Sequence, residues 1–131
     1  MTHPDFATLD DRALAEAALD EKLGFVRAKA IMELANRALT NPALLDRVCE
    51  AISTDRSIGF HRQAPLGWFG ADQIYLSGQE HAMRALLAEM NSWSSTEQED
   101  LVRHWAGRRG IAVVTEELKA LYGWNPRYGN Q

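Results

Sequence analysis

The chain has 131 residues, of which 46% are hydrophobic and 24% charged, and its formal net charge at pH 7 is −4. This length suits one domain and leaves little room for two, so we expect a single domain over residues 1–131. The ordinary hydrophobic fraction excludes a chain that is disordered throughout, and the acidic balance disfavours general affinity for nucleic acids.

The sequence also bears on the cellular compartment. Its single cysteine, Cys49, cannot form a disulfide within the chain, so the expected fold does not depend on an oxidising environment. Residues 1–5 lack the basic and apolar regions of a signal peptide, and no apolar run approaches the roughly 20 residues of a membrane span. We therefore expect a soluble cytoplasmic protein that does not associate with membranes.

The first predicted elements are helical. Residues 9–23 are rich in Ala, Leu and Glu, and Thr8 with Asp11 resembles a capping box in front of them. A heptad-like apolar stripe continues over 14–39, with Gly24 inside it. A continuous helix and a helical hairpin that bends at Gly24 are both compatible with this stripe. We favour the hairpin, because the Ala-rich stripe suits close antiparallel packing. The same stripe could face a second copy, which leaves monomer and homodimer open.

A third helix is predicted from Asn41-Pro42, because asparagine can cap a helix and proline is favoured at its first position. We expect it to end near Ser53. A cysteine on its apolar face is expected to be a small buried hydrophobe rather than a nucleophile. That face follows helical spacing and consists of Leu45, Val48, Cys49 and Ile52.

Residues 54–77 differ from the rest, because they combine glycine and proline with aromatic side chains. Two interpretations remain open. In the first, a short β-hairpin turns at Ala64-Pro65. In the second, aromatic side chains pin an ordered irregular connection in which residues 73–76 are extended.

This middle segment also carries the candidate partner-binding residues. Ordering so many loop residues costs conformational entropy, so some interaction has to compensate for it. Trp, Tyr and Arg are the side chains that dominate hot spots in protein–protein interfaces. The competing explanation is that the aromatic side chains simply fill the core. The candidate residues are Phe60, His61, Arg62, Trp68, Phe69 and Tyr75.

Two capping boxes predict the next two helices. The first pairs Ser77 with Glu80, and the second pairs Ser94 with Glu97. The second of these helices should stop at one of the two glycines in 107–110.

The C-terminal part is harder to assign, because the β-branched run over 111–114 fits a strand or a helix. We predict a last helix over 116–122, closed by Gly123, followed by an extended or frayed tail over 124–131. In total, the pattern predicts a mostly α, single-domain bundle of about five to six helices with an irregular middle segment over 54–77.

The leading functional hypothesis is a binding protein. The four histidines lack the spacing of a metal site, and the sequence contains no glycine-rich phosphate loop and no nucleophile motif. We therefore expect no metal, no cofactor and no catalysis. The protein would act as a small, acidic adaptor, assembly factor or inhibitor that docks onto another protein or complex through the middle segment.

The first alternative is a DNA-binding regulator. A predicted helix, the sequence Gly-Arg-Arg-Gly and a further helix loosely resemble a helix-turn-helix. Glu116 weakens this hypothesis, because aligning the turn on Gly110 places this acid where the second helix should bury an apolar residue. The candidate contacts to phosphates, clustered with His104, are Arg103, Arg108 and Arg109.

A second alternative is a small enzyme whose site lies in the middle segment. It would use His61 with Asp55 or Asp72. A general base needs a neighbour that orients it and a reachable pocket, and sequence spacing alone establishes neither.

Overall fold

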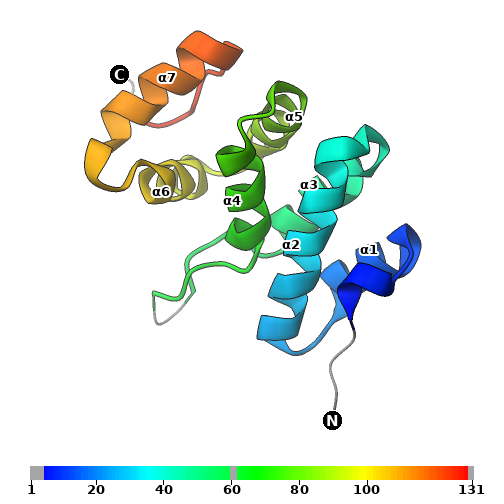
Figure 1. Ribbon diagram of the computed structural model, residues 1–131. Coiled ribbons are helices and arrows are strands. Elements are labelled where there is room, and N and C mark those ends of the chain that lie inside the picture. The colour runs from blue at the N-terminus through cyan, green and yellow to red at the C-terminus, as the bar shows by residue number, and fades with distance from the viewer. Residues whose placement is uncertain (1–4, 60–61, 130–131) are drawn as a thin grey trace.

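The computed structural model describes residues 5–59 and 62–129, and Figure 1 shows how their helices are arranged. This part of the chain forms seven α-helices and three short 3-10 turns, and it contains no β-strand. The mostly helical class is confirmed, whereas the predicted number of helices is too low. The helices are α1 (Asp11–Asp20), α2 (Gly24–Thr40), α3 (Leu45–Thr54), α4 (Gly67–Ser77), α5 (Glu80–Met90), α6 (Ser95–Ala106) and α7 (Ile111–Tyr122). The 3-10 turns are Phe6–Thr8, Pro42–Leu44 and Gly107–Arg109.

The first two helices are separate, as the hairpin interpretation predicted. Residues 21–23 interrupt the helical backbone, and Gly24 opens the second helix. Asp10 caps α1, because its carboxylate accepts the backbone N–H three residues further on at 2.8 Å. The predicted capping box between Thr8 and Asp11 is wrong, since Thr8 belongs to a preceding 3-10 turn.

α2 packs against α1, α3 and α4 (Figure 1). Because residues 21–23 are not helical, the helical spacing of α1 does not continue into α2. The positions of the predicted apolar stripe are therefore not all on the buried side of α2. Phe25, expected on the buried stripe, is exposed, whereas its neighbour Val26 is buried. Ile31 and Leu34 then continue the buried side that the other helices cover.

α3 has the predicted apolar face but starts later than expected. The side chain of Asn41 makes no capping hydrogen bond, and a 3-10 turn over Pro42–Leu44 precedes the helix. The helix ends at Thr54, one residue beyond the predicted end. All four residues of the predicted face are buried, namely Leu45, Val48, Cys49 and Ile52.

α4 is the largest departure from the prediction. It occupies 67–77, so the described residues of the middle segment that are irregular are 55–59 and 62–66. The extended piece expected at 73–76 is helical. The described residues of this segment contain no β-hairpin, and the predicted turn at Ala64-Pro65 is wrong. Gly59 is instead hydrogen-bonded to the residues at 62 and 63, because its carbonyl accepts the N–H of Arg62 and its N–H donates to the carbonyl of Gln63, both at 2.9 Å.

Two glycines allow α4 to lie very close to its neighbours. A Cβ on Gly67 would lie 2.2 Å from the carbonyl oxygen of Ile52 and 2.6 Å from that of Asp55. A Cβ on Gly70 would lie 2.6 Å from Cγ2 of Ile31. Since any larger residue would collide with α2 or α3, these glycines set the depth at which α4 is seated.

Charged side chains fix the loop before α4 to the helices around it. Arg27 on α2 donates to the carboxylate of Asp55 at 3.1 Å. Arg56 Nε donates to Oε1 of Glu97 on α6 at 3.1 Å, and the hydroxyl of Ser57 donates to the other oxygen of the same carboxylate. Glu97 therefore holds the loop against the start of α6.

The two predicted capping boxes have opposite outcomes. The box at the start of α6 is confirmed, because Ser94 Oγ accepts the N–H of Glu97 at 3.1 Å and the carboxylate of Glu97 accepts the N–H of Ser94 at 3.0 Å. The box between Ser77 and Glu80 is wrong. Ser77 is the last residue of α4, and Gly78, with a φ of +69°, ends that helix before α5 begins.

The C-terminal part is more ordered than the sequence predicts. α7 includes 111–114, so these β-branched residues form a helix rather than a strand, and the predicted start at residue 116 is too late. The tail is irregular, but it is packed through residue 129. Trp124 Nε1 donates to Oδ1 of Asn91 at 3.0 Å, and the hydroxyl of Tyr128 lies 2.9 Å from Oγ1 of Thr115.

Buried apolar side chains from all seven helices and from the tail form one connected core. Over the described ranges, no helix is long and apolar enough to cross a membrane.

We expect Gly→Ala substitutions in α4 to lower the free energy of unfolding, and to lower it most where the added Cβ comes closest to neighbouring atoms. Gly70→Ala should cost about 1–3 kcal/mol through overpacking, although alanine favours helices over glycine by about 1 kcal/mol. Gly67→Ala should cost more, because the colliding atoms belong to the backbone. Unfolding in denaturant, followed by circular dichroism, measures the difference.

The matched control for this series is Gly24→Ala. A Cβ at Gly24 would meet its nearest neighbour, Leu66 Cδ1, at an ordinary 3.7 Å. This variant should keep or slightly raise the stability. Equal losses at Gly24 and Gly70 would contradict the close-approach explanation.

The Glu97 carboxylate should make stability depend on pH. Burial alone would raise its pKa, but hydrogen bonds from Ser57, from the Ser94 N–H and from Arg56 outweigh burial and lower the pKa below the ordinary value of 4.5. A depressed folded-state pKa contributes stability above the unfolded-state value, and this stability is lost as pH falls through the folded-state value.

Glu97→Gln keeps the hydrogen-bonding shape of the side chain and removes its charge. We expect this variant to be about 1 kcal/mol less stable than the wild type at neutral pH, and we expect the gap to narrow as pH falls below the ordinary value of 4.5 and through the lowered folded-state pKa. Urea unfolding over a series of pH values, from neutral to acid, measures the difference. A gap that persists unchanged in acid would show that the charge is not its cause.

Candidate functional site

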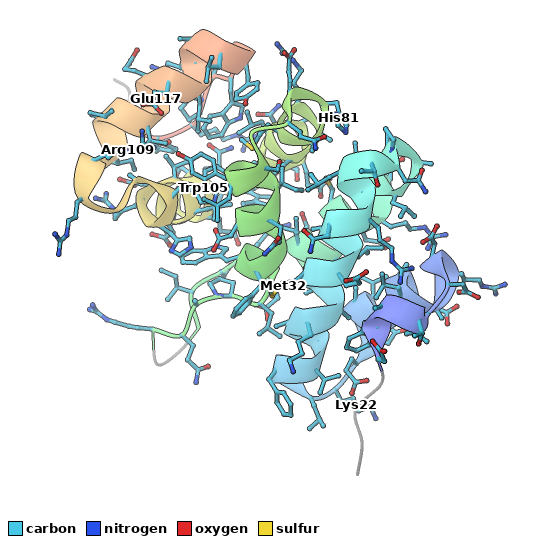
Figure 2. All side chains as sticks on the ribbon, viewed as in Figure 1. Lys22, Met32, His81, Trp105, Arg109 and Glu117 are labelled. Atoms are coloured by element: carbon cyan, nitrogen blue, oxygen red, sulfur yellow. The ribbon has the colours of Figure 1, made fainter. Side chains whose placement is uncertain are left out.

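α4 and α6 hold two stacked ring pairs between them. Trp68 on α4 stacks on His104 of α6 with ring centroids 4.6 Å apart and an interplanar angle of 21°. Tyr75, two turns further along α4, stacks on Trp105 at 4.5 Å and 3°. Figure 2 shows Trp105 between the two helices. We name this surface the α4–α6 face and define it by Trp68, Asp72, Tyr75, Leu76, His104 and Trp105.

Asp72 connects the two ring pairs. Its carboxylate lies within hydrogen-bond distance of His104 Nε2, at 2.9 Å from Oδ2 and 3.1 Å from Oδ1. Trp105 Nε1 donates to Oδ1 at 3.1 Å. The side chain of Asp72 is 33% exposed and that of His104 is 40% exposed. One carboxylate thus orients two rings and still reaches solvent.

Arg109 extends this arrangement to α7. Its Nη2 donates to the hydroxyl of Tyr75 at 2.7 Å, and its Nη1 donates to both carboxylate oxygens of Glu117 at 2.8 and 3.1 Å. Figure 2 shows Arg109 and Glu117 next to α6 and α7. The positive charge of Arg109 is therefore matched by Glu117, whereas Asp72 forms no ion pair with Arg or Lys in the described residues.

A small pocket opens on the α4–α6 face. It has a volume of about 140 Å³ and is lined by Asp72, Tyr75, Leu76, His104 and Trp105. Sites for drug-sized ligands are larger, at about 300–1,000 Å³. The pocket therefore suits the end of one side chain better than a whole small molecule.

The outward side of α4 carries exposed apolar side chains. Phe69 is 43% exposed and Leu76 is 78% exposed. They lie seven residues apart and therefore on the same side of the helix. Leu76 also lines the pocket, so the exposed apolar side and the pocket form one continuous surface.

The structure distributes the six sequence-predicted docking residues unevenly. Trp68 lies in the core, Tyr75 is half-buried in the ring stack, and Phe69 is exposed on α4. Arg62 lies in the loop before α4, exposed and with a φ of +60°. The remaining two candidates, Phe60 and His61, lie outside the described residues.

The structure also joins residues that the sequence assigned to different hypotheses. Trp68 and Tyr75 came from the docking segment, whereas His104 and Arg109 came from the DNA-binding cluster. Two features of this surface were not predicted from the sequence, namely the exposure of Leu76 and the hydrogen bond between Asp72 and Trp105. Helical spacing at positions 68, 72, 75 and 76 is the signal that could have placed these residues on one side of a helix.

Two of the three arginines in the basic C-terminal cluster form ion pairs with carboxylates. Arg103 pairs with Glu99 at 2.8 Å, and Arg109 is bound as described above. Arg108 is exposed and forms no ion pair with the described residues. Glu116 is exposed rather than buried, since Val114, Thr115 and Leu118 form the inward side of α7.

The structure also bears on the candidate nucleophile Cys49 and on the acids considered for an enzyme site. Cys49 is buried, and burial, together with the charges of Glu89 and Asp46, raises the pKa of its thiol to about 12. Almost none of it is the reactive thiolate at neutral pH. Of the acids considered for an enzyme, Asp55 pairs with Arg27, and Asp72 contacts His104 rather than serving a loop site. In the part of the chain that the structure describes, no three His, Cys, Asp or Glu side chains are grouped to hold a metal ion.

Comparison of the chain with protein-family models, curated proteins and solved structures finds no match. The α4–α6 face and its surroundings are therefore the basis on which function is inferred.

Proposed function

We propose that this protein is a non-catalytic docking module, acting as an adaptor, assembly factor or inhibitor, and that it binds a partner protein through the outward side of α4. The observation that carries the proposal is the exposure of Phe69 and Leu76 on one side of a helix, next to a pocket walled by stacked rings. Burying large apolar side chains is the main source of favourable free energy in protein association.

The rigidity of the neighbouring rings supports this proposal. Tyr75 is held by its stack on Trp105 and by Arg109, and Trp105 is held by its hydrogen bond to Asp72. Side chains that are already ordered lose little conformational entropy on binding. The α4–α6 face therefore has the character of a preorganised interface.

The partner that fits this surface best is an amphipathic helix. Phe69 and Leu76 are separated by about 10 Å along α4, because a helix rises 1.5 Å per residue. A second helix packed along α4 can place apolar side chains over both positions. The charge on the surface selects the polar side of that helix. The carboxylate of Asp72 contacts His104 but pairs with no Arg or Lys of the described residues, so a cationic residue on the partner helix would complement it.

The test of docking uses a double substitution on α4. Because both residues are exposed, Phe69→Ala with Leu76→Ala should change the folding free energy by no more than about 0.5 kcal/mol per site. It should weaken partner binding at least about tenfold, as expected for hot-spot residues. A photo-crosslinking residue at position 69 captures the partner in the host cell, and calorimetry with that purified partner then measures the affinity.

The matched control is Val113→Ala with Leu121→Ala, which removes two exposed apolar side chains from α7. This control should bind the partner with wild-type affinity. The proposal fails if position 69 captures no protein. It also fails if the two double variants bind the captured partner equally well.

A second proposal, DNA binding through α6 and α7, is favoured by one observation. Arg108 is exposed and directly precedes Arg109 in the chain, and no carboxylate of the described residues pairs with it. The exposed acids Glu116 and Glu117 weigh against contact with phosphates, because they would face the same polyanion.

If α6 and α7 bind DNA, a duplex should be retained at low ionic strength, and its affinity should fall steeply as salt rises. Arg103→Ala with Arg108→Ala should flatten that salt dependence, whereas Arg12→Ala with Arg47→Ala, on α1 and α3, should not. Fluorescence anisotropy with a labelled duplex measures both. Absence of any retention at about 50 mM salt rules this proposal out.

A further inference from the structure

The pocket on the α4–α6 face has the size of a side-chain site. At about 140 Å³ it holds the end of one long side chain, and its wall consists of one carboxylate, three rings and the methyl groups of Leu76. This composition is specific enough to select a guest by its charge.

The carboxylate sets the sign of that charge. Asp72 supplies a carboxylate that contacts His104 at 2.9 Å and forms no ion pair with Arg or Lys in the described residues. An anionic guest would be repelled at short range, where water does not fully screen the interaction. A cationic guest would gain a charge-assisted hydrogen bond to the carboxylate.

Asp72 also keeps room for such a bond. Oδ1 accepts the N–H of Trp105 and lies 3.1 Å from His104 Nε2, and among the described residues Oδ2 contacts only that same His104 nitrogen. A carboxylate offers about four lone-pair sites. Oδ2 therefore keeps a free lone pair, and the contacts that Asp72 already makes hold that oxygen in place.

The remaining walls suit the rest of a lysine side chain. The electron-rich rings of Tyr75 and Trp105 attract a cation. Leu76, which is 78% exposed, offers apolar surface at the mouth for a methylene stem. An ammonium group is compact and fits a narrow pocket with a single carboxylate, whereas a planar guanidinium favours two parallel acceptors.

We propose that this pocket binds the ammonium group of a lysine side chain, presented by the partner helix that the docking proposal invokes. The lysine enters over Leu76, lays its stem on Tyr75 and donates to Oδ2 of Asp72. The inference rests on the proposed docking function for the source of the lysine, but the pocket can be tested with small molecules alone.

The experiment is an NMR titration of the full chain with n-butylammonium chloride. n-Butanol serves as the neutral probe of similar shape, and sodium butyrate serves as the anionic one. The reporter is the indole N–H resonance of Trp105, because this group donates to Asp72. The indole resonances of Trp93 and Trp124, bound to Ser53 and Asn91, are internal controls.

Butylammonium should shift the Trp105 indole resonance saturably at millimolar concentration, while Trp93 and Trp124 stay in place. Butanol and butyrate should bind at least about tenfold more weakly. Equal shifts with butanol and butylammonium, or a shift that does not saturate, would overturn the inference.

Asp72→Asn tests the carboxylate, because an asparagine oxygen can still accept from Trp105 while the charge is gone. It should weaken butylammonium binding at least about tenfold, whereas Asp46→Asn, at an exposed position of α3, should not. Leu76→Lys is the second variant, and its exposed site makes misfolding no concern. Its own ammonium should occupy the pocket and abolish butylammonium binding, while Leu121→Lys on α7 should leave that binding unchanged.

The outcomes separate the lysine pocket from the docking function. If the Phe69 and Leu76 double variant loses its partner but butylammonium does not bind the wild type, docking stands and the lysine pocket is wrong. If Asp72→Asn or Leu76→Lys binds butylammonium as tightly as the wild type does, the pocket assignment is likewise wrong.

Discussion

The deep seating of α4 against α2 and α3 is the constraint on which the rest of the structure depends. Gly67 and Gly70 make it possible, because side chains at these positions would occupy the space of a backbone oxygen and of Ile31. With one side of α4 pressed into the core, its opposite side is turned to α6 and to solvent. Tyr75 thereby reaches its ring partner, and Leu76 is left exposed.

The α4–α6 face is ordered by the fold itself. The carboxylate of Asp72, two stacked ring pairs and the bridge from Tyr75 through Arg109 to Glu117 are all internal contacts. The conformational entropy of these side chains is therefore lost when the protein folds, before any partner binds. The proposed docking would therefore use side chains that are already ordered, which distinguishes it from the loop-mediated docking that the sequence suggested.

The sequence predicted elements well where local signals agree and poorly where tertiary contacts decide. Ser94 and Glu97 form the expected cap, and the apolar face of α3 is where its periodicity places it. α4 was missed because glycine disfavours helices in isolation, while close packing outweighs that preference here. The site could not be predicted, because Tyr75 and Trp105 are thirty positions apart and only the packing of two helices joins them.

Gln98 illustrates how one side chain can fix a segment that has no regular structure. It is fully buried in α6, its Nε2 donates to the carbonyl of Met90 at 2.7 Å, and its Oε1 accepts the N–H of Arg127 at 2.8 Å. The amide thus acts as a two-ended connector between the end of α5 and the tail. Glutamate could accept but not donate, and leucine could do neither. Among these three side chains only the amide both donates and accepts, so Gln98 adds an anchor for the tail between those that Trp124 and Tyr128 supply.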